Sequence, residues 1–307
     1  MGFADFSEIL TWLKANNISK KAAVAAAHDL DALSSVVAAK REGILESILV
    51  GDGEKIRNFL AELGEDATSW EIIEEKDDAK AAQIVSQLVA DKKADMPMKG
   101  LLQTATFMKA VLNKNMGMIS DKAIISQSTI FHYKQENRLM LVTDCAINVA
   151  PDYSMKVQIV QNAVKLCHQL GIEKPKVAIV APLEQVNPNI QSTVDAAMLT
   201  IANMRGQIKG CFVDGPLGFD NAVSLEAVQH KGIKSEVAGR ADVLVMPDLA
   251  AGNILDKSLR YFSGYTAAGV VSGANVPLIF TSRTDTAENK LNSIVVSVLQ
   301  ALKKDVV

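Results

Sequence analysis

Short apolar runs rich in β-branched residues recur along the chain, and stretches of helical length lie between them. Gly, Pro, Asp or Asn bounds each run, as is typical of buried parallel strands. The runs cover residues 47–51, 70–73, 138–142, 176–180, 211–213, 241–246 and 276–280. Amphipathic helical patterns cover residues 152–170, 190–204 and 252–269. This alternation predicts an α/β fold with mainly parallel sheets.

The number of predicted strands fits two sheets better than one. The pattern is interrupted at residues 120–137 by a polar segment that contains Ser-Gln-Ser-Thr at 126–129 and Lys-Gln-Glu-Asn at 134–137. We therefore place a domain boundary in this segment.

Composition excludes several classes of function. The chain has 307 residues, of which 49% are hydrophobic, so it can bury a substantial core. Its formal net charge of −3 lacks the basic excess of a nucleic-acid surface. No apolar stretch is long enough for a bilayer, and the first residues lack the pattern of a secretory signal, so we expect a cytoplasmic protein without a membrane partner.

The cysteines and histidines give no sign of a metal centre. The three cysteines are odd in number and far apart, which argues against a disulfide framework and a thiolate metal site. The four histidines have no partner at metal-ligand spacing. The chain also lacks the dinucleotide fingerprint and the P-loop, so we predict no nicotinamide or ATP site.

Four predicted strands end in polar residues, at 142–145, 213–216, 246–248 and 280–283. In open α/β sheets, ligands bind beyond the carboxyl ends of the strands. These four ends are therefore the places where we expect the site.

The segment 281–288, Thr-Ser-Arg-Thr-Asp-Thr-Ala-Glu, joins a predicted strand to the last helix. Asp285 and Glu288 have the spacing of a helix cap, so the helix is expected to begin near Asp285. A hydroxyl from Ser282, a guanidinium from Arg283 and a helix N-terminus together suit an oxyanion or phosphate. The alternative is that the acids only cap the helix and Arg283 is a surface charge.

Two other strand ends also have two interpretations. In residues 214–222, Asp214, Asp220 and Asn221 either reach a ligand or belong to a tight Gly-Pro turn with Asp220 as the next helix cap, which the pattern favours. Residues 248–253, from Asp248 to Asn253, mark either a helix start or a close approach to a ligand at a glycine.

Cys145 follows a strand and is a possible nucleophile. No neighbour in its segment marks it as activated, so a buried structural thiol is favoured.

Taken in order, these segments resemble the phosphate acetyl/butyryltransferase family, and most closely its phosphate butyryltransferase branch. The similar stretches span nearly the whole chain and lie at residues 98–101, 108–114, 143–148, 205–210, 214–217, 220–222, 237–239, 247–248, 251–253 and 281–283. Each stretch alone is a weak signal, whereas the series in order is specific.

The resemblance implies two α/β domains like those of isocitrate dehydrogenase, with the active site in a cleft between them. The first domain would be discontinuous, with residues 1–126 and 272–307, and the second would cover 127–271. The resemblance also implies a homo-oligomer, a dimer or larger, and no metal or organic cofactor. CoA or acyl-CoA and phosphate or acyl phosphate would be the substrates.

The family's reaction is direct: the CoA thiolate attacks the acyl phosphate, an oxyanion forms, and phosphate leaves. By match to the family motif, Ser282 would stabilise the oxyanion and Arg283 would hold phosphate. The acetyltransferase branch has a proposed aspartate base seven residues after the serine, where this chain has Asn289. Glu288 or Asp285 is therefore expected to take that role.

Seven further residues lie in the similar stretches or in segments that approach the cleft in the family, and are expected to contact substrate. Cys145 among them is interpreted as a neighbour of the site rather than a nucleophile. The seven are Thr104, Ser128, Cys145, Asn148, Asp214, Asp248 and Asn253.

The resemblance favours acyl chains of three to five carbons, branched ones included. The alternatives are a phosphate acetyltransferase and a non-catalytic module that senses acyl-CoA. An oxidoreductase similar to isocitrate dehydrogenase would need a metal-binding aspartate set and a nicotinamide site, and the sequence has neither.

Overall fold

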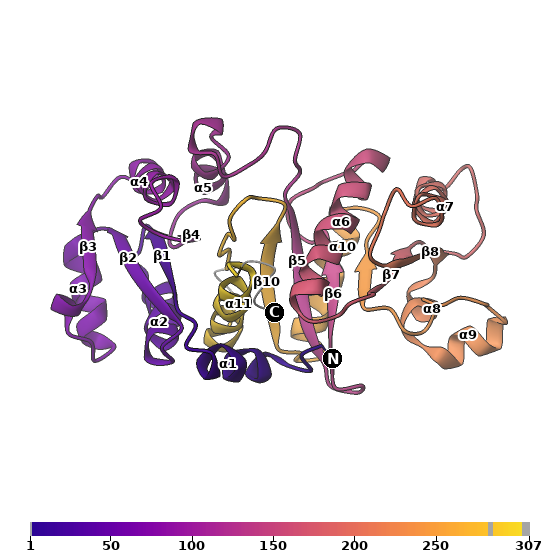
Figure 1. The fold of residues 1–307 in the computed structure, drawn as a ribbon, viewed down its shortest axis with the longest axis horizontal. Helices are drawn as coiled ribbons and strands as arrows, with labels where there is room; N and C mark the ends of the chain where they lie inside the picture. Colours follow the sequence, from indigo (N-terminus) through magenta and orange to yellow (C-terminus); the bar gives the residue numbers. More distant parts are fainter. Residues whose placement is uncertain (1, 282–284, 303–307) are drawn as a thin grey trace. The chain divides into compact units, whose positions relative to one another are not determined.

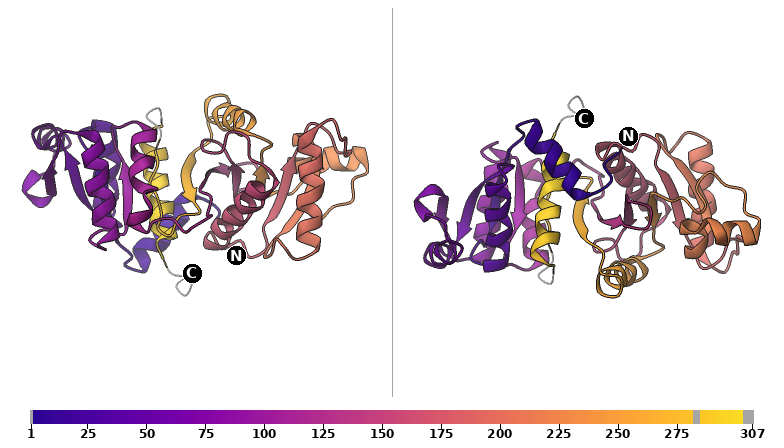
Figure 2. Two further views of the ribbon diagram at one scale, coloured as in Figure 1. Left: turned by 90° about the horizontal axis from the view of Figure 1, so that it is seen from above. Right: turned by 90° about the horizontal axis from the view of Figure 1, so that it is seen from below.

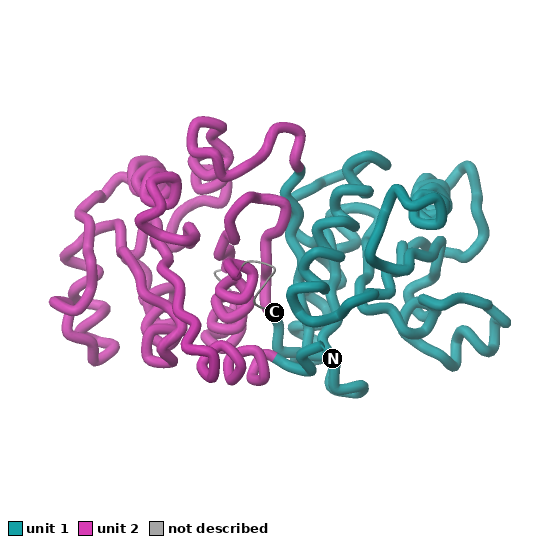
Figure 3. Tube along the Cα trace, viewed as in Figure 1, with its two compact units in different colours: residues 1–5, 124–267, 307 teal, residues 6–123, 268–306 magenta. Residues whose placement is uncertain are grey.

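The structure is a computed structural model, and residues 2–281 and 285–302 are described. The chain divides into two compact units, each built from its own strands and helices (Figure 3). Unit 1 contains residues 2–5 and 124–267, and unit 2 contains residues 6–123 and the described part of 268–306. The division into folding domains drawn from the sequence stays a prediction.

Unit 2 is built on a parallel sheet with the strand order β3-β2-β1-β4 (Figure 1). The buried middle strands β1 and β2 carry the alanine, valine and leucine side chains of the core. The strands are β1 (Lys20–Ala25), β2 (Leu45–Gly51), β3 (Glu71–Glu74) and β4 (Met96–Lys99). The helices are α1 (Phe6–Ala15), α2 (Leu30–Arg41), α3 (Gly53–Glu62), η1 (Ala67–Ser69), α4 (Asp78–Ala90), α5 (Thr104–Val111), η2 (Lys114–Met116) and α11 (Ala287–Gln300).

The last helix of the chain belongs to unit 2, where it packs against the first two helices. α11 contacts α2 and α1, and Figure 2 shows α11 (yellow) lying beside α1 (indigo). The unit therefore combines the start of the chain with its end.

Unit 1 has the strand order β5-β6-β9-β7-β8, in which β5 is antiparallel to β6 and the others are parallel. The strands are β5 (Ser126–Tyr133), β6 (Arg138–Thr143), β7 (Lys176–Val180), β8 (Phe212–Leu217) and β9 (Val243–Val245). The helices are α6 (Tyr153–Gln169), α7 (Gln191–Met204), α8 (Phe219–Val223), α9 (Leu225–Lys231) and α10 (Leu249–Tyr261). β10 (Ala267–Ser272) begins at the last residue of unit 1 and continues in unit 2.

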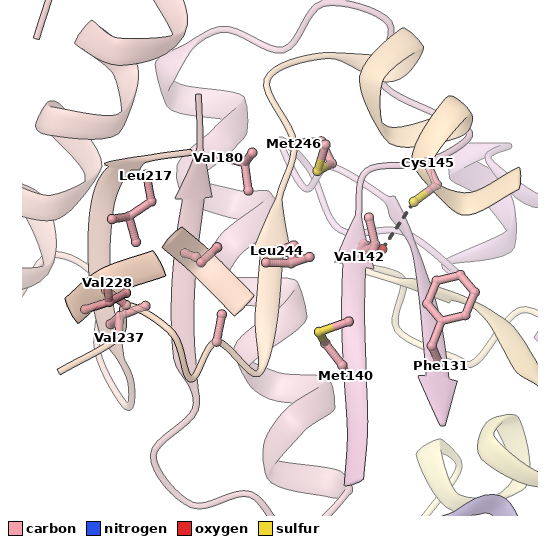
Figure 4. Packing of buried hydrophobic residues seen from close by; sticks show 14 of the residues in the cluster. Phe131, Met140, Val142, Cys145, Val180, Leu217, Val228, Val237, Leu244 and Met246 are labelled. Carbon is pink, nitrogen blue, oxygen red and sulfur yellow. Dashed lines mark hydrogen bonds between the residues drawn. The ribbon is translucent and has the colours of Figure 1, made fainter. Parts of the chain in front are cut away.

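One hydrophobic cluster of unit 1 lies on one face of this sheet (Figure 4). Phe131, Met140, Val142 and Leu244 project from neighbouring strands and pack with residues of α8, α9 and α10. Burial of such aliphatic and aromatic side chains contributes roughly 1.5–3 kcal/mol each to the free energy of folding.

Aspartates define where several helices begin. The side chains of Asp29, Asp52, Asp77, Asp152 and Asp248 each accept a hydrogen bond from the backbone N–H three residues later. Such N-caps satisfy a donor that the first helical turn leaves open, and each contributes about 1 kcal/mol.

Most of the predicted elements are present, and the α/β fold with mainly parallel sheets is confirmed. β7 covers the whole predicted run 176–180, and β6 contains the run 138–142. The helical patterns at 152–170 and 190–204 correspond to α6 and α7.

Three predictions from the pattern are wrong. Residues 276–280 form no strand and contribute only isolated bridges, Ile279 to Met98 and Leu278 to Val271. The helical pattern 252–269 ends at Tyr261, because the chain turns there towards β10. The polar segment 120–137, interpreted as an interruption, contains the mostly buried strand β5.

Within the described residues, none of the helices has the length and apolar character needed to cross a membrane.

Candidate active site

The parallel strands of unit 1 present their carboxyl ends at one edge of the sheet. β6, β9, β7 and β8 are neighbours in that order, so the residues that follow them share this edge. The edge carries Asp144, Asp248, Glu184 and Asn221. It is where ligands bind in open α/β sheets.

Asp144 organises the turn after β6. Its buried carboxylate accepts hydrogen bonds from the backbone N–H of Ala146 (2.9 Å) and Ile147 (3.0 Å) through Oδ1. Oδ2 accepts from the backbone N–H of Asn148 (3.3 Å) and from Asn148 Nδ2 (2.5 Å). One carboxylate thus fixes both the backbone of residues 144–148 and the side chain of Asn148.

The network also fixes the orientation of the Asn148 amide. Nδ2 donates one hydrogen to Asp144 and the other to the carbonyl of Ile125 (2.9 Å). The amide oxygen has no hydrogen-bond partner in the described part of the chain, so this acceptor is the only polar group that the Asn148 side chain can offer to a ligand. A ligand group held by Asn148 is therefore an N–H, O–H or S–H donor.

Helix α10 packs directly on this turn. Asp248 caps it by accepting from the N–H of Ala251 (2.9 Å), and Asn253 Nδ2 donates to the carbonyl of Cys145 (3.2 Å). A Cβ on Gly252 would lie 2.0 Å from the carbonyl oxygen of Asp144, so this position requires glycine. Of the two interpretations of this segment, the helix start is confirmed, and the close approach at Gly252 is to the chain's own backbone.

Cys145 has the environment of a structural thiol. It is buried, and its Sγ donates to the carbonyl of Val142 (3.3 Å; Figure 4). Burial, and then the negative charges of Asp256 and Asp144, raise the pKa of this thiol far above its ordinary value. It stays protonated at neutral pH, which disfavours a nucleophilic role.

Ser128 lies next to this turn, on the neighbouring strand. It pairs in register with Thr143 and is completely buried. Its hydroxyl has no partner among the described residues. An unsatisfied buried hydroxyl costs about 1–3 kcal/mol, which a buried water bound to the Ser128 hydroxyl would offset.

Asp214 lies away from this group, on the edge strand β8. It is half-buried, and Oδ1 accepts from the N–H of Gly215 (2.8 Å). The predicted Gly215-Pro216 turn is wrong, because both residues continue β8. The predicted cap is also wrong: Gly218 precedes α8, and Asp220 pairs with Lys231 (3.3 Å).

Asn221 holds the ends of β7 and β8 together. Its Nδ2 donates to Glu184 Oε1, which also accepts from Lys231 Nζ (2.9 Å). The Lys231 ammonium lowers the pKa of Glu184. The carbonyl of Asn221 accepts from the N–H of Gly239 (2.7 Å), so the stretches 220–222 and 237–239 singled out in the sequence are in contact.

In unit 2, Thr104 is the exposed first residue of α5, just after β4. Lys99, at the end of β4, is buried, with Nζ 3.3 Å from the carbonyl of Gly100. A Cβ on Gly100 would lie 2.4 Å from the carbonyl oxygen of Ala26, so only glycine fits at this position beside the end of β1.

The start of α11 differs from the prediction by one residue. Thr286, not Asp285, is the N-cap, and its side chain accepts from the N–H of Asn289 (3.2 Å). Glu288 is exposed in the first turn, Asp285 is half-buried and Asn289 is buried. The predicted catalytic residues Ser282 and Arg283 lie outside the described residues.

The structure therefore brings Cys145, Asn148, Asp248 and Asn253 together around one turn, with Ser128 on the adjacent strand. Asp144 is a site residue that was not predicted from the sequence, although it follows a strand and precedes Asn148 by four residues. Among the residues that the structure describes, His, Cys, Asp and Glu side chains form no group of three that suits a metal ion.

Residues 79–298 match the family described as phosphate acetyl/butaryl transferase. The chain belongs to this family. Its sequence is 44% identical over 299 residues to the phosphate butyryltransferase of Clostridium acetobutylicum, covering 97% of this chain and 99% of that protein.

Similarity to solved structures supports the assignment to this family. The branched-chain phosphotransacylase of Enterococcus faecalis V583 superimposes with a TM-score of 0.82 at 31% identity, covering 92% of this chain and 99% of that one. The 4-hydroxythreonine-4-phosphate dehydrogenase of Klebsiella pneumoniae, with a TM-score of 0.55 and 12% identity over 92% of this chain and all of that one, shares the fold alone.

Proposed function

We propose that this protein is a phosphotransacylase of the phosphate butyryltransferase type. It transfers a short acyl group between CoA and inorganic phosphate, so that butyryl-CoA and phosphate give butyryl phosphate and CoA. The observation that carries this proposal is the 44% identity to a phosphate butyryltransferase over 97% of the chain. The similarity to a branched-chain phosphotransacylase supports acyl chains of three to five carbons, branched ones included.

In the direction of CoA acylation, the thiolate attacks the carbonyl carbon of the acyl phosphate. A C–S bond forms, the carbonyl oxygen becomes an oxyanion, and the C–O bond to phosphate breaks as the carbonyl returns. Catalysis requires donors at the oxyanion, a cation for phosphate and a base for the thiol. By match to the family motif, Ser282 donates to the oxyanion and Arg283 is the cation that holds phosphate.

The turn after β6 supports a role for Asn148 in binding CoA. Asp144 and the carbonyl of Ile125 take both amide hydrogens, so the side chain can only accept a further hydrogen bond, through its amide oxygen. CoA offers matching donors in its thiol and in the two amide N–H groups of its pantetheine arm. Asn148 therefore orients the arm, and the Ser128 hydroxyl adds a second polar group on the neighbouring strand.

For the base, Glu288 is the better candidate of the two acids. It is exposed in the first turn of α11, whereas Asp285 is half-buried and Asn289 lacks an acid. Glu288→Gln is expected to lower kcat/KM and to change its pH profile, while Asp285→Asn is the matched comparison. Unchanged profiles in both variants would assign proton removal to another group or to water.

The deciding experiment measures thiol release from butyryl-CoA with and without phosphate. Acetyl-CoA and isobutyryl-CoA are compared, and the protein is first dialysed against EDTA, since we propose that no metal or organic cofactor takes part. Phosphate-dependent release establishes the activity, and a preference for acetyl-CoA would assign the acetyltransferase type instead. Saturable CoA binding without release would indicate an acyl-CoA sensor.

Arg283 is tested through the substrate that it is proposed to hold. Arg283→Ala is expected to raise the KM for phosphate much more than the Kd for CoA, because a bidentate guanidinium contact to phosphate is lost. Phosphate kinetics equal to those of the unaltered protein would remove Arg283 from the site. We also propose a homo-oligomer and a cytoplasmic location, which sedimentation and cell fractionation would test.

A further inference from the structure

Lys290 is a buried cation in an unfavourable place. It lies in the first turn of α11, where the positive end of the helix dipole disfavours another positive charge. Its side chain is only 4% exposed, and burial of an ammonium group is costly unless the charge is paired. A lysine at this position therefore works against stability.

The pairing of Lys290 is weak compared with that of another buried lysine, Lys156. Lys156 Nζ lies 2.6 Å from Asp195, both side chains are 6% exposed, and Gln191 donates to the second carboxylate oxygen (2.8 Å). Lys290 Nζ instead lies 3.3 Å from Asp31, whose side chain is 68% exposed. In the described part of the chain this is the one ion pair of Lys290, and its ammonium group makes no hydrogen bond there.

The surroundings of Lys290 favour an anion. Asp31 is the second residue of α2, so the ammonium lies between the N-terminal turns of two helices. Open N–H groups at helix starts bind phosphate and carboxylate oxygens. A second buried lysine, Lys99, ends β4, and its N–H donates to the carbonyl of Ile279 (3.0 Å).

We propose that Lys290 binds a phosphoryl oxyanion of a substrate. The proposal rests on the proposed function, which supplies two sources: the phosphate that is exchanged and the phosphates of CoA. An ammonium group that makes no hydrogen bond within the described residues complements the charge of such a group, and a bound oxyanion would offset the cost of burying the lysine. Without a ligand, the Asp31 carboxylate lies next to the ammonium group, where the oxyanion would bind.

The alternative is that Lys290 and Asp31 only fasten α11 to α2. Removal of either partner would then destabilise unit 2 similarly and leave ligand binding unchanged. An oxyanion site predicts different effects, because Asp31 competes with the ligand for the ammonium group.

The test compares Lys290→Met, Lys290→Arg and the control Asp31→Asn in the full-length protein. Calorimetric titration with inorganic phosphate probes one source, and titration with CoA and dephospho-CoA probes the other. Lys290→Met is expected to weaken one of the two by on the order of 10- to 100-fold, the equivalent of a charge-assisted contact. Lys290→Arg is expected to restore most of this loss, and Asp31→Asn to keep or improve affinity.

Unchanged affinity for both ligands in Lys290→Met, with equal losses of Tm in Lys290→Met and Asp31→Asn, would overturn the proposal. Measurements of phosphate binding and thiol release on the unaltered protein distinguish this outcome from failure of the proposed function. If it binds phosphate through Lys290 but releases no thiol from acyl-CoA, the transferase activity is refuted and the oxyanion site stands.

Discussion

Asp144→Asn is the substitution that tests the turn after β6 most directly. It keeps the size of the side chain and removes the charge. Oδ1 can keep its hydrogen bonds from Ala146 and Ile147, but the new Nδ2 then faces the two donors of Asn148. Rotation of the amide by 180° only exchanges the pair of bonds that is lost.

The expected loss follows from the two hydrogen bonds at Oδ2. Hydrogen bonds to charged groups contribute about 1.5–3 kcal/mol each, and the 3.3 Å bond lies at the weak end. The variant should therefore lose roughly 2–4 kcal/mol of unfolding free energy. Because Asn148 also loses its orientation, kcat/KM should fall by about 10- to 100-fold, as for other misplaced contact groups.

Urea denaturation followed by circular dichroism measures the first effect, and thiol release from butyryl-CoA measures the second. Asp248→Asn is the matched control for stability on the same edge, since asparagine caps a helix as well as aspartate does. The reasoning is refuted if Asp144→Asn is as stable as Asp248→Asn and as active as the unaltered protein.

Further predictions concern the cysteines and the glycine beside Asp144. Cys145→Ala should keep activity within about threefold, since a raised pKa leaves no thiolate to act as nucleophile; an inactive but folded variant would contradict this. Gly252→Ala should cost more than about 3 kcal/mol, because the methyl group meets the Asp144 carbonyl oxygen; a melting temperature like that of the unaltered protein would contradict the close approach. Burial raises the pKa of Cys211 from 9.0 to about 11, so its stabilising contribution is complete below pH 9 and is lost as the pH rises towards 11. The urea midpoint should therefore fall between pH 9 and 11, and Cys211→Ser should fall less.

The hydrophobic pattern predicted some strands, such as β7, and missed others, such as β5. After Lys176, β7 is an uninterrupted run of buried aliphatic residues, and its bounds follow from sequence alone. β5 begins Ser-Gln-Ser-Thr and is nevertheless buried, because Asn162 Nδ2 donates to Ser126 Oγ (3.0 Å) and Gln127 Nε2 to Thr129 Oγ1 (3.2 Å). Asn162 lies 36 positions from Ser126 in the sequence, so no local pattern identifies this partner.

The converse error occurred at residues 276–280. The run is apolar and Leu278 and Ile279 are fully buried, so the predicted burial is confirmed. It is not a strand, because it pairs with its neighbours only through isolated bridges. Burial is a property of the side chains, whereas strand formation depends on a partner backbone that the sequence does not reveal.

The candidate site, too, could be predicted only in part from the sequence. The sequence located the strand end at 142–145, and the structure confirms that polar residues gather there. It did not distinguish Asp144, whose carboxylate holds the turn, from Asn148, whose oxygen is left to accept. Lys290 could not be selected at all, since a lysine in a helix is ordinarily exposed, and its burial follows from the packing of α11 on α2.

The return of α11 to unit 2 bears on how the chain acquires its structure during synthesis. Residues 6–123 emerge from the ribosome first, yet the helix that packs on α1 and α2 ends at residue 300. At about 5–20 residues per second, this first part waits roughly 10–35 s for that helix. Residues 124–267, which make up most of unit 1, are continuous and can complete their packing earlier. The first part of the chain to be translated is thus among the last to be completed, and until then the surfaces of α1 and α2 that receive α11 are open to chaperones and proteases.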